Sequence, residues 1–397
     1  MKIKSVLIIS SLYKPNVGGV ETTVEELADQ YLKRGIKVTI LTKLFPSNLE
    51  PYELIKGVPV YRIPRPKTEA EFIETIKWLK KNNSKLKSDV IHLIQVHRPL
   101  PLLALLLSRL WKVPFIANYA GGDVIEVGDD FGKKMWKEAN GTVKEALLQA
   151  NTHISFSKGL ISDVKKTIPE IKKVELIYAG LDVSSINKSE IYNPGYPYIV
   201  SVRRLEKSKG IDLLIKAFDK LSESYPHLHL IIVGNGSEKK NLESLATDLN
   251  SREKIHFTGT LPLKTTFSYL KGSMASICPS RAEAGGIINF AAQAAKTVPI
   301  GSNVGGIPEY ILHNKTGLIF ESEKVDKLAE CIEHIISDID LRQKLIENGW
   351  LNVQKYDWSN IANKYVNSYV NAINTKHDYN FNSWSELTQK LWEIINE

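Results

Sequence analysis

Short apolar runs alternate with helix-like segments along this chain, and this alternation constrains its fold more than any other feature. The first run, residues 5–9, is followed by a loop containing Pro and Gly, a helical pattern over residues 21–34 and a second apolar run at 37–41. This β-α-β order favours strands that pair in parallel and are joined by a covering helix. Further apolar runs lie at residues 58–63, 90–94, 115–117 and 153–156. The pattern predicts an α/β fold with a parallel sheet covered by helices on both faces.

The same alternation restarts after a polar segment, residues 187–198, that is rich in Asn, Pro, Gly and Ser. Such a composition is typical of a linker between domains. The later apolar runs lie at residues 199–202, 228–233, 254–257 and 274–278. Because 397 residues exceed the usual size of one hydrophobic core, we expect two α/β domains, residues 1–190 and 191–370, followed by a C-terminal helix within 371–397.

Composition narrows the class of partner. The chain has 43% hydrophobic and 24% charged residues, as is ordinary for a globular protein, and a formal net charge of +8. The positive charge favours a nucleotide-linked substrate, an anionic membrane surface or nucleic acid. The sequence lacks zinc-ligand spacing, helix-turn-helix patterns and aromatic-basic RNA signatures. We therefore expect no nucleic-acid partner.

The cysteines and the apolar segments indicate a cellular location. Two cysteines, Cys278 and Cys331, make no disulfide framework and suit a reducing cytoplasm. The most apolar segment, residues 99–116, is interrupted by two basic residues and a proline before it reaches the roughly 20 residues that a membrane span needs. No cleavage site follows the first apolar run, so we interpret it as a strand rather than a signal peptide.

A basic amphipathic helix is predicted between residues 71 and 87. Apolar residues share one face while lysines and a tryptophan lie elsewhere: Phe72, Ile76 and Leu79 against Lys77, Trp78, Lys80 and Lys81. Lys85 and Lys87 add charge at its end. This helix either rests on anionic lipid headgroups, as in a peripheral membrane enzyme, or covers the sheet with its charged face in solvent.

The segment from residue 280 to residue 309 places a carboxylate and two glycines where an apolar helix begins. Glu283 precedes Gly285 and Gly286, and residues 287–295 form an Ala-rich helical run. The first N–H groups of a helix and the positive end of its dipole can receive a phosphate, which glycines allow to approach closely. Glu283 would then contact hydroxyl groups. The alternative is a Gly-rich turn between a strand and a core helix.

Two further loops follow predicted strands. Arg204 and Lys209 lie five residues apart in a loop that leads into a helix, where a guanidinium fork and a mobile ammonium group can clamp a diphosphate. Gly18 and Gly19 follow the first strand, at the carboxyl end of the sheet, where open α/β sheets bind ligands. The alternatives are a solvated turn for the two cations and a tight turn for the two glycines.

Six motifs occur together in one order. They are VGGVE at 17–21, RRLEKSKGIDLL at 203–214, VGNGSE at 233–238, FTG at 257–259, PSRAEAGG at 279–286 and NVGGIPE at 303–309. This combination closely resembles the family-four retaining glycosyltransferases, over nearly the whole chain. The resemblance implies the GT-B fold, in which two Rossmann-like domains with parallel sheets face each other across a cleft. It also implies that the chain's end crosses back to the first domain, although the C-terminal helix can instead mediate association with another chain.

The resemblance implies an enzyme that moves a sugar from a UDP- or GDP-linked donor to an acceptor hydroxyl with retention of anomeric configuration. No metal, cofactor or side-chain nucleophile is implied, because the leaving phosphate oxygen can take the acceptor proton. The implied catalytic residues are Arg204 and Lys209 for the diphosphate and Glu283 for the sugar hydroxyls. The implied donor contacts are Gly18, Gly19, Gly234, Asn235, Gly236, Thr258, Gly286, Ile287 and Ile288.

Two positions depart from the family pattern. Ala291 stands where the family has the second glutamate of its Glu-x7-Glu motif, and Ala120 stands where it has a first-domain histidine. Polar residues that can contact the sugar or the acceptor instead are His97, Asn118, Tyr119 and Asp123. The alternatives are a surface histidine without a ligand for His97 and an N-cap of the following segment for Asp123. The losses keep a non-catalytic GT-B scaffold subunit of a glycosyltransferase complex open as an alternative. The retained charged residues favour an active enzyme.

The acceptor is expected to be a saccharide or a lipid-linked saccharide, in the assembly of surface polysaccharide, lipopolysaccharide or glycolipid. The net positive charge, the basic helix after residue 71 and the apolar stretch after residue 99 favour this class. We therefore expect a cytoplasmic enzyme that is peripheral at the inner face of the plasma membrane.

Overall fold

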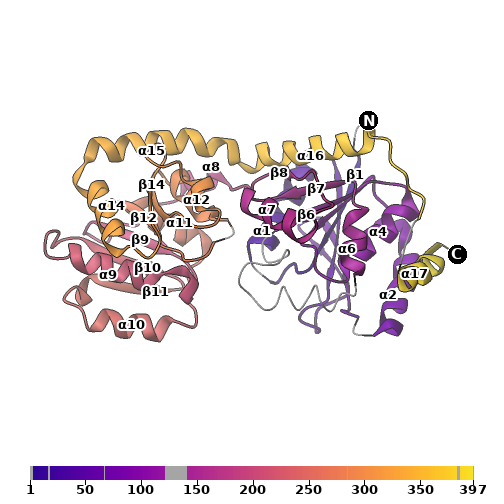
Figure 1. Ribbon diagram of the computed structural model, residues 1–397, viewed down its shortest axis with the longest axis horizontal. Coiled ribbons are helices and arrows are strands. Elements are labelled where there is room, and N and C mark those ends of the chain that lie inside the picture. Colours follow the sequence, from indigo (N-terminus) through magenta and orange to yellow (C-terminus); the bar gives the residue numbers. More distant parts are fainter. Residues whose placement is uncertain are drawn as a thin grey trace. The chain divides into compact units, whose positions relative to one another are not determined.

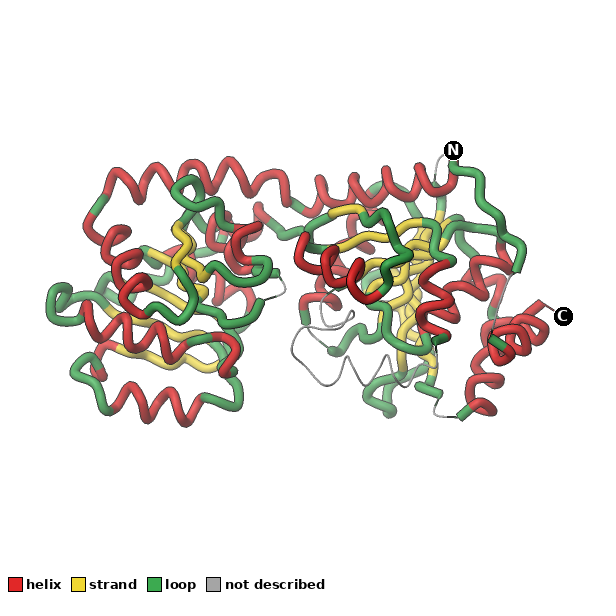
Figure 2. The backbone as a smooth tube through the Cα atoms, viewed as in Figure 1, coloured by secondary structure: helices red, strands yellow, loops and turns green. Residues whose placement is uncertain are grey.

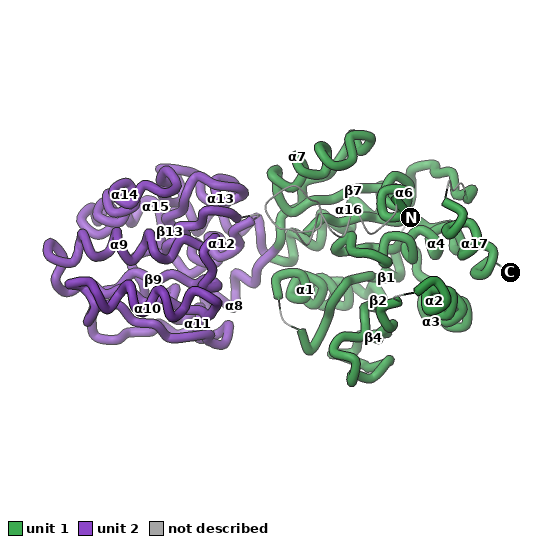
Figure 3. Tube along the Cα trace, turned by 60° about the horizontal axis from the view of Figure 1, so that its bottom comes forward, with its two compact units in different colours: residues 1–179, 358–397 green, residues 180–357 purple. Residues whose placement is uncertain are grey.

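The computed structural model describes residues 3–16, 18–66, 68–120, 141–283, 285–381 and 385–396. The chain divides into two compact units, which Figure 3 shows in different colours. Unit 1 comprises Met1–Ala179 and Trp358–Glu397, and unit 2 comprises Gly180–Asp357. Each unit is built around its own sheet, as expected for two α/β domains.

The boundary between the units differs from the predicted one at two places. Residues 180–190, expected in the first domain, belong to unit 2. There, Lys271 Nζ donates a 2.9 Å hydrogen bond to the carbonyl oxygen of Ser189. Residues 358–370, expected in the second domain, belong to unit 1, because helix α16 (Trp358–Asn374) packs against α1 of that unit.

The sheet of unit 1 has eight strands in the order β3-β4-β2-β1-β5-β6-β7-β8 (Figure 1). Their bounds are β1 Ser5–Ser10, β2 Lys37–Lys43, β3 Tyr52–Ile55, β4 Val58–Ile63, β5 Val90–Ile94, β6 Phe115–Tyr119, β7 Thr152–Ser155 and β8 Glu175–Leu176. Neighbours pair in parallel, and Val6 of β1 lies opposite Val38 and Val90. The exception is β3, which forms an antiparallel hairpin with β4. This hairpin was not predicted, because three of its four residues are exposed and the segment carries no apolar run.

The helices of unit 1 bury the apolar faces that the sequence predicts. They are α1 Gly19–Lys33, α2 Glu69–Lys81, α3 Asn83–Leu86, α4 Leu100–Trp111, α6 Thr142–Leu148, α7 Lys158–Thr167, α16, and α17 Glu386–Asn396. On α2, the buried apolar residues are Phe72, Ile76 and Leu79. Of the two alternatives for this helix, the structure shows its apolar face packed on the core, and contact of its lysines with lipid headgroups stays a prediction. No helix in the described ranges is long and apolar enough to cross a membrane.

The C-terminal helix α17 packs on α2 and α4 of unit 1, and Figure 3 shows it beside α2. Leu391 and Ile395 join the core of this unit. Around them, Lys390 Nζ lies 2.6 Å from Glu69 Oε1. The apolar stripe of this helix is thus covered by its own chain.

The sheet of unit 2 has six parallel strands in the order β11-β10-β9-β12-β13-β14. Their bounds are β9 Tyr198–Val202, β10 His229–Val233, β11 Ile255–Gly259, β12 Ala275–Cys278, β13 Val298–Ser302 and β14 Leu318–Phe320. The helices are α8 Val183–Lys188, α9 Ile211–Leu221, α10 Lys239–Thr247, α11 Leu263–Gly272, α12 Ile287–Ala294, α13 Ile307–Tyr310, α14 Val325–Ser337 and α15 Ile339–Val353. Figure 2 shows helices on both sides of these strands, so the sheet forms the centre of the unit.

Candidate active site

Glu283 lies on the loop that joins β12 to α12, at the carboxyl end of the sheet of unit 2. The Gly305-Gly306 pair holds the backbone of this residue. The Gly306 N–H donates to Glu283 O at 2.9 Å. Gly305 has φ +52°, and a Cβ added there would lie 1.8 Å from Glu283 O. Position 305 therefore requires a glycine for two reasons. Its φ is positive, and a side chain there would collide with the backbone of Glu283.

The cationic loop, defined as residues 203–210, follows β9 and is supported by the turn after β10. A Cβ at Gly234 would lie 1.8 Å from Arg203 O, and a Cβ at Gly236 would lie 2.3 Å from Leu205 O. The Leu205 N–H donates to Asn235 O at 2.9 Å. The residues Gly234, Asn235 and Gly236 were expected as donor contacts. The structure shows that they pack against the backbone of the cationic loop.

Arg281 ties the cationic loop to the loop that carries Glu283. Its backbone N–H donates to Ser208 O at 2.8 Å, and its Nη1 donates to Lys207 O at 2.9 Å. Two guanidinium nitrogens bind both carboxylate oxygens of Asp212, at 2.7 and 2.8 Å. This bidentate pair fixes the separation of the two loops. Arg281 was not predicted as a site residue although it lies in the motif at 279–286, because its role is a contact with the cationic loop that only the tertiary structure shows.

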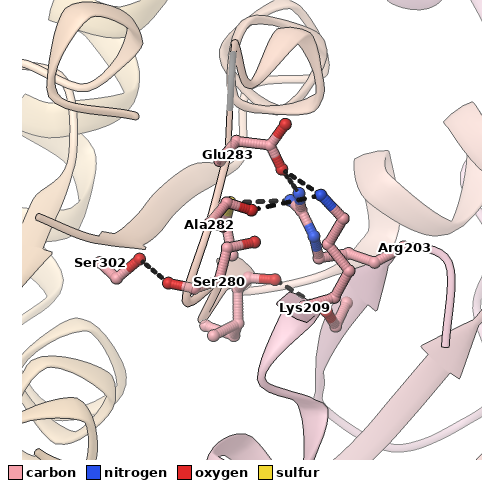
Figure 4. A network of polar contacts seen from close by, with 9 residues as sticks. Arg203, Lys209, Ser280, Ala282, Glu283 and Ser302 are labelled. Carbon is pink, nitrogen blue, oxygen red and sulfur yellow. Dashed lines mark hydrogen bonds and ion pairs between the residues drawn. The ribbon is translucent and has the colours of Figure 1, made fainter. Parts of the chain in front are cut away.

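Two cations meet on the carboxylate of Glu283 (Figure 4). Lys209 Nζ lies 3.2 Å from Oε2, and the guanidinium group of Arg203 forms an ion pair with the same oxygen. Arg203 Nη1 also donates to Cys278 Sγ at 2.7 Å. The three charged side chains of Arg203, Lys209 and Glu283 are only 7%, 14% and 15% exposed, so solvent screens their attraction weakly.

Arg203 was not predicted as a site residue, and Arg204, which was predicted to bind the diphosphate together with Lys209, does not contact Glu283. Arg204 points to solvent, with its side chain 72% exposed and Nη1 2.8 Å from Glu206 Oε1. The two arginines follow β9 directly, so their side chains leave the strand end on opposite faces. The structure therefore brings Lys209 and Glu283 together, adds Arg203 to them, and leaves Arg204 at the surface.

The start of α12 faces the same loop. Gly286 is its N-cap residue with φ +137°, and no side chain caps the helix there. Ile287 is 39% exposed, and Ala291 is buried. Of the two polar residues around Ala291, Asn289 is fully buried, while Gln293 donates to Tyr310 O at 2.7 Å. Gln293 is thus used by the structure and does not replace the missing glutamate.

In unit 1, Gly18 and Gly19 lie where β1 leads into α1. Gly18 is the N-cap of α1 in an extended conformation, and no side chain caps this helix either. A Cβ at Gly19 would have no atom within 4 Å, whereas one at Gly18 would lie 2.5 Å from Glu21 Oε2. The backbone at Gly19 therefore has open space beside it.

The predicted polar contacts of unit 1 are mostly used by its core. Asn118 is fully buried, where its Oδ1 accepts a 2.7 Å hydrogen bond from the hydroxyl of Tyr365. Tyr119 is also fully buried, with its hydroxyl 3.0 Å from His153 Nδ1. Strand alternation and tertiary packing turn both side chains inward, which corrects their assignment as ligand contacts. His97 is half-buried in the loop after β5, and Asp123 lies outside the described residues.

Two further positions named in the sequence, Ala120 and Thr258, are at the ends of strands. Ala120, which stands where the family has a histidine, is half-buried directly after β6. Thr258 on β11 is half-buried, and its Oγ1 donates to Gly259 O at 3.0 Å. Within the described ranges, no group of three or more His, Cys, Asp or Glu residues is placed to hold a metal ion.

The fold is that of known two-domain enzymes. The solved structure of Anabaena Alr3699/HepE in complex with UDP matches this chain with a TM-score of 0.71 at 17% identity, covering 94% of this chain and 100% of that one. This likeness and the two Rossmann-like units define the GT-B fold class.

Family comparisons identify the protein more closely. Residues 17–185 match Glycosyltransferase Family 4, and residues 183–350 match Glycosyl transferases group 1. The chain therefore belongs to the family-four, group 1 glycosyltransferases, a family of retaining enzymes.

Relatives of this chain span nearly its full length. An uncharacterized glycosyltransferase of Methanocaldococcus jannaschii is 28% identical over 386 residues, which cover 91% of this chain and 96% of the relative. A GDP-mannose-dependent monoacylated alpha-(1-6)-phosphatidylinositol monomannoside mannosyltransferase of Corynebacterium glutamicum is 23% identical over 389 residues, which cover 92% of this chain and 97% of the relative.

Proposed function

We propose that this protein is a retaining, metal-independent hexosyltransferase. It moves a sugar from a UDP- or GDP-linked donor to a hydroxyl of a saccharide or lipid-linked saccharide, in the assembly of surface polysaccharide, lipopolysaccharide or glycolipid. The observation that carries this proposal is the meeting of Arg203 and Lys209 on the carboxylate of Glu283, beside the start of α12.

Unit 2 offers partners for a diphosphate. Arg204 is held by a surface ion pair with Glu206, a contact that contributes little and that a phosphate can replace. The uncapped start of α12 offers the N–H groups of Gly286, Ile287 and Ile288, together with the positive end of the helix dipole. In our proposal, the distal phosphate of the donor binds at this helix start.

Lys209 changes partner in our proposal when the donor binds. Its ammonium group moves from Glu283 to the diphosphate and stabilises the negative charge that grows as the diphosphate leaves. Arg203 stays on Glu283 and keeps the carboxylate oriented to accept hydrogen bonds from the sugar hydroxyls. The leaving phosphate oxygen takes the proton of the acceptor hydroxyl, so no side-chain nucleophile is required.

The other proposed contacts come from residues at strand ends. Gly18 and Gly19 supply backbone N–H groups from unit 1, and Thr258 lies near the nucleoside. His97 is the proposed contact for the sugar or the acceptor. Since Ala291 has no polar side-chain group, the ribose is bound without a carboxylate at this position.

Names of relatives support the substrate classes. HepE was solved with UDP, and the Corynebacterium enzyme uses GDP-mannose and a phosphatidylinositol mannoside by its name. We propose the same two substrate classes for this chain: a nucleotide-sugar donor and a lipid-linked acceptor. The exposed lysines of α2 fit a cytoplasmic protein that binds peripherally to an anionic membrane.

The test is acceptor-dependent release of nucleoside diphosphate from a panel of UDP- and GDP-linked sugars, with membrane extract as the acceptor source. An active enzyme releases UDP or GDP with at least one donor when extract is present, and NMR of the product shows the anomeric configuration of the donor. Inverted configuration contradicts the retaining mechanism. No release with any donor, together with co-purification of an active glycosyltransferase, supports the scaffold alternative instead.

A further inference from the structure

Asn289 carries a buried amide group that has no hydrogen-bond partner. The residue lies in the first turn of α12, three residues after the N-cap residue Gly286, and its side chain is fully buried. Neither Nδ2 nor Oδ1 makes a hydrogen bond, and within the described ranges Asn289 is the residue with two such buried side-chain atoms. A buried amide without partners destabilises a fold, so its presence beside a ligand site indicates a role in the bound state.

The core around α12 is able to satisfy an amide group. Gln293, one turn further along the same helix, is also buried and has a partner at each end of its amide. Nε2 donates to Tyr310 O at 2.7 Å, and Oε1 accepts from Asn352 Nδ2 at 3.0 Å. The unpaired state of Asn289 is therefore local to the start of the helix, where we propose that a phosphate binds.

The amide of Asn289 lies between the start of α12 and the end of β12. On the helix side, a Cβ added at Gly286 would lie 2.8 Å from Nδ2. On the strand side is the thiol of Cys278. Burial raises the pKa of this thiol, the charge of Arg203 lowers it, and the side chains of Asn289 and Ser280 lower it further because they lie beside the sulfur. The name thiol cluster is used below for Arg203, Cys278, Ser280 and Asn289.

Donors in the thiol cluster compete for one sulfur atom. Arg203 Nη1 donates to Cys278 Sγ at 2.7 Å. The other buried donors of the cluster have no hydrogen-bond partner; they are Arg203 Nε, Ser280 Oγ and Asn289 Nδ2. A thiol sulfur is a weak acceptor, and the guanidinium group of Arg203 already occupies it. The amide of Asn289 therefore gains the sulfur as a partner when Arg203 moves away.

The thiol cluster joins the two parts of the proposed donor site. Arg203 binds the carboxylate of Glu283, the proposed contact of the sugar, and Asn289 lies behind the helix start, the proposed contact of the phosphate. When Lys209 leaves Glu283 for the diphosphate, Arg203 no longer shares this carboxylate with a second cation. The attraction between opposite charges then draws the guanidinium group closer to Glu283 and away from the sulfur.

We propose that Asn289 is a positioning residue whose amide is unpaired in the free enzyme and becomes hydrogen-bonded when the donor binds. In the bound state, Nδ2 donates to Cys278 Sγ and Oδ1 accepts from the hydroxyl of Ser280. These bonds hold the start of α12 in place around the phosphate and add to the affinity for the nucleotide. The inference rests on the proposed function, because it assumes that a nucleotide diphosphate binds at this helix.

The test replaces the amide by an apolar group of nearly the same shape. In Asn289→Leu, the unpaired polar atoms are removed, so we expect the full-length free protein to unfold at a higher urea concentration, as followed by circular dichroism. The bonds of the bound state are removed as well. We therefore expect the affinity for UDP or GDP, measured by isothermal titration calorimetry, to fall roughly three- to tenfold. A residue that only fills the core does not produce these opposite changes.

The matched control is the same replacement at the satisfied amide of α12. Gln293→Leu removes the two hydrogen bonds to Tyr310 and Asn352, so we expect a lower urea midpoint and an affinity for the nucleotide within about twofold of the wild type. A second variant, Asn289→Ala, removes the amide without adding a branched side chain. It is expected to bind the nucleotide as weakly as Asn289→Leu, and it decides the question if the leucine variant does not fold.

The outcomes separate this inference from the proposed function. If Asn289→Leu is more stable but binds UDP and GDP as tightly as the wild type, the amide has no role in binding and the inference is wrong. If Asn289→Leu is folded but less stable than the wild type, the amide is already hydrogen-bonded in the free protein, and the inference is again wrong. A wild-type protein that binds neither UDP nor GDP contradicts the donor class of the proposed function, and the inference falls with it.

Discussion

Lys209 Nζ lies 3.2 Å from Glu283 Oε2, and both side chains are about 15% exposed or less. The guanidinium group of Arg203 binds the same oxygen from a more buried position. The two cations differ in what else holds them. Arg203 also donates to Cys278 Sγ, whereas Lys209 otherwise reaches only the carbonyl of Ala282, at 3.4 Å, among the described residues. We infer that Lys209 is the cation that can leave Glu283 for a ligand.

Replacing Arg203 is expected to destabilise unit 2. The Arg203→Met variant leaves Glu283 with one cationic partner and Cys278 without its donor, so we expect a loss of about 1–3 kcal/mol in the free energy of unfolding. Urea unfolding followed by circular dichroism measures it. The matched control, Arg204→Met, removes an exposed ion pair and is expected to change stability by less than about 0.5 kcal/mol. Equal effects of the two variants contradict the inward assignment of Arg203.

Replacing Glu283 is expected to impair transfer more than folding. Glu283→Gln keeps the shape of the side chain but removes the charge that orients the sugar hydroxyls, so we expect kcat to fall about 10²-fold. Steady-state kinetics with the best donor measures kcat and KM separately. A change confined to KM would show that the carboxylate contributes binding alone.

Replacing Gly305 is expected to displace Glu283. In Gly305→Ala, the added Cβ meets Glu283 O, and φ is +52°. Backbone strain alone costs about 1–2 kcal/mol for a side chain in the left-handed region. The control is Gly195→Ala in the same unit, where φ is +88° and no atom lies within 4 Å of the added Cβ. We expect both variants to lose stability and only Gly305→Ala to lose transfer activity; equal activity losses would contradict the positioning role.

The stability of unit 1 is expected to depend on two histidines, the fully buried His92 and the half-buried His153. Burial lowers the pKa of His92 from 6.5 to about 3, while Nδ1 receives a 2.6 Å hydrogen bond from the hydroxyl of Tyr369. Burial also lowers the pKa of His153 to about 4. The unfolded chain therefore binds protons below pH 6.5 that the folded chain does not bind until the lower pKa is reached.

The sign of this dependence follows from proton linkage. The contribution of each histidine is complete above pH 6.5 and is lost as pH falls through the window down to about 3 for His92 and about 4 for His153. Each contributes up to about 1.4 kcal/mol per pH unit in that window. Urea unfolding of the wild type at about pH 7 and about pH 5 measures the slope. In His92→Asn we expect a smaller slope, and an unchanged slope would contradict the buried neutral state of His92.

Much of the fold follows from the sequence because it rests on local patterns. The helix over 21–34, the buried face of α2 and the parallel strands are fixed by apolar periodicity, and all three are confirmed. The hairpin formed by β3 was not predicted, because three of its four residues are exposed and they form no apolar run.

The sequence motifs predicted which loops form the candidate site, but they did not predict which side chains of those loops point into it. Glu283 and Lys209 were selected by type and spacing, and the structure brings them together. Which of two adjacent arginines turns inward depends on where β9 ends relative to the Glu283 loop, and that relation is tertiary. For the same reason, Asn118 was expected at a ligand and is buried against Tyr365 instead.

The most direct test of the central claim compares two lysines of the cationic loop. Lys209 contacts Glu283, whereas Lys207 is exposed and its backbone carbonyl, which a side-chain substitution leaves in place, accepts from Arg281. Acceptor-dependent release of UDP or GDP is measured for the wild type, Lys209→Ala and Lys207→Ala. We predict that Lys209→Ala lowers the rate about 10²-fold or more, while Lys207→Ala stays within a few-fold of the wild type. Equal rates for Lys209→Ala and the wild type would contradict the proposal that Lys209 stabilises the leaving diphosphate.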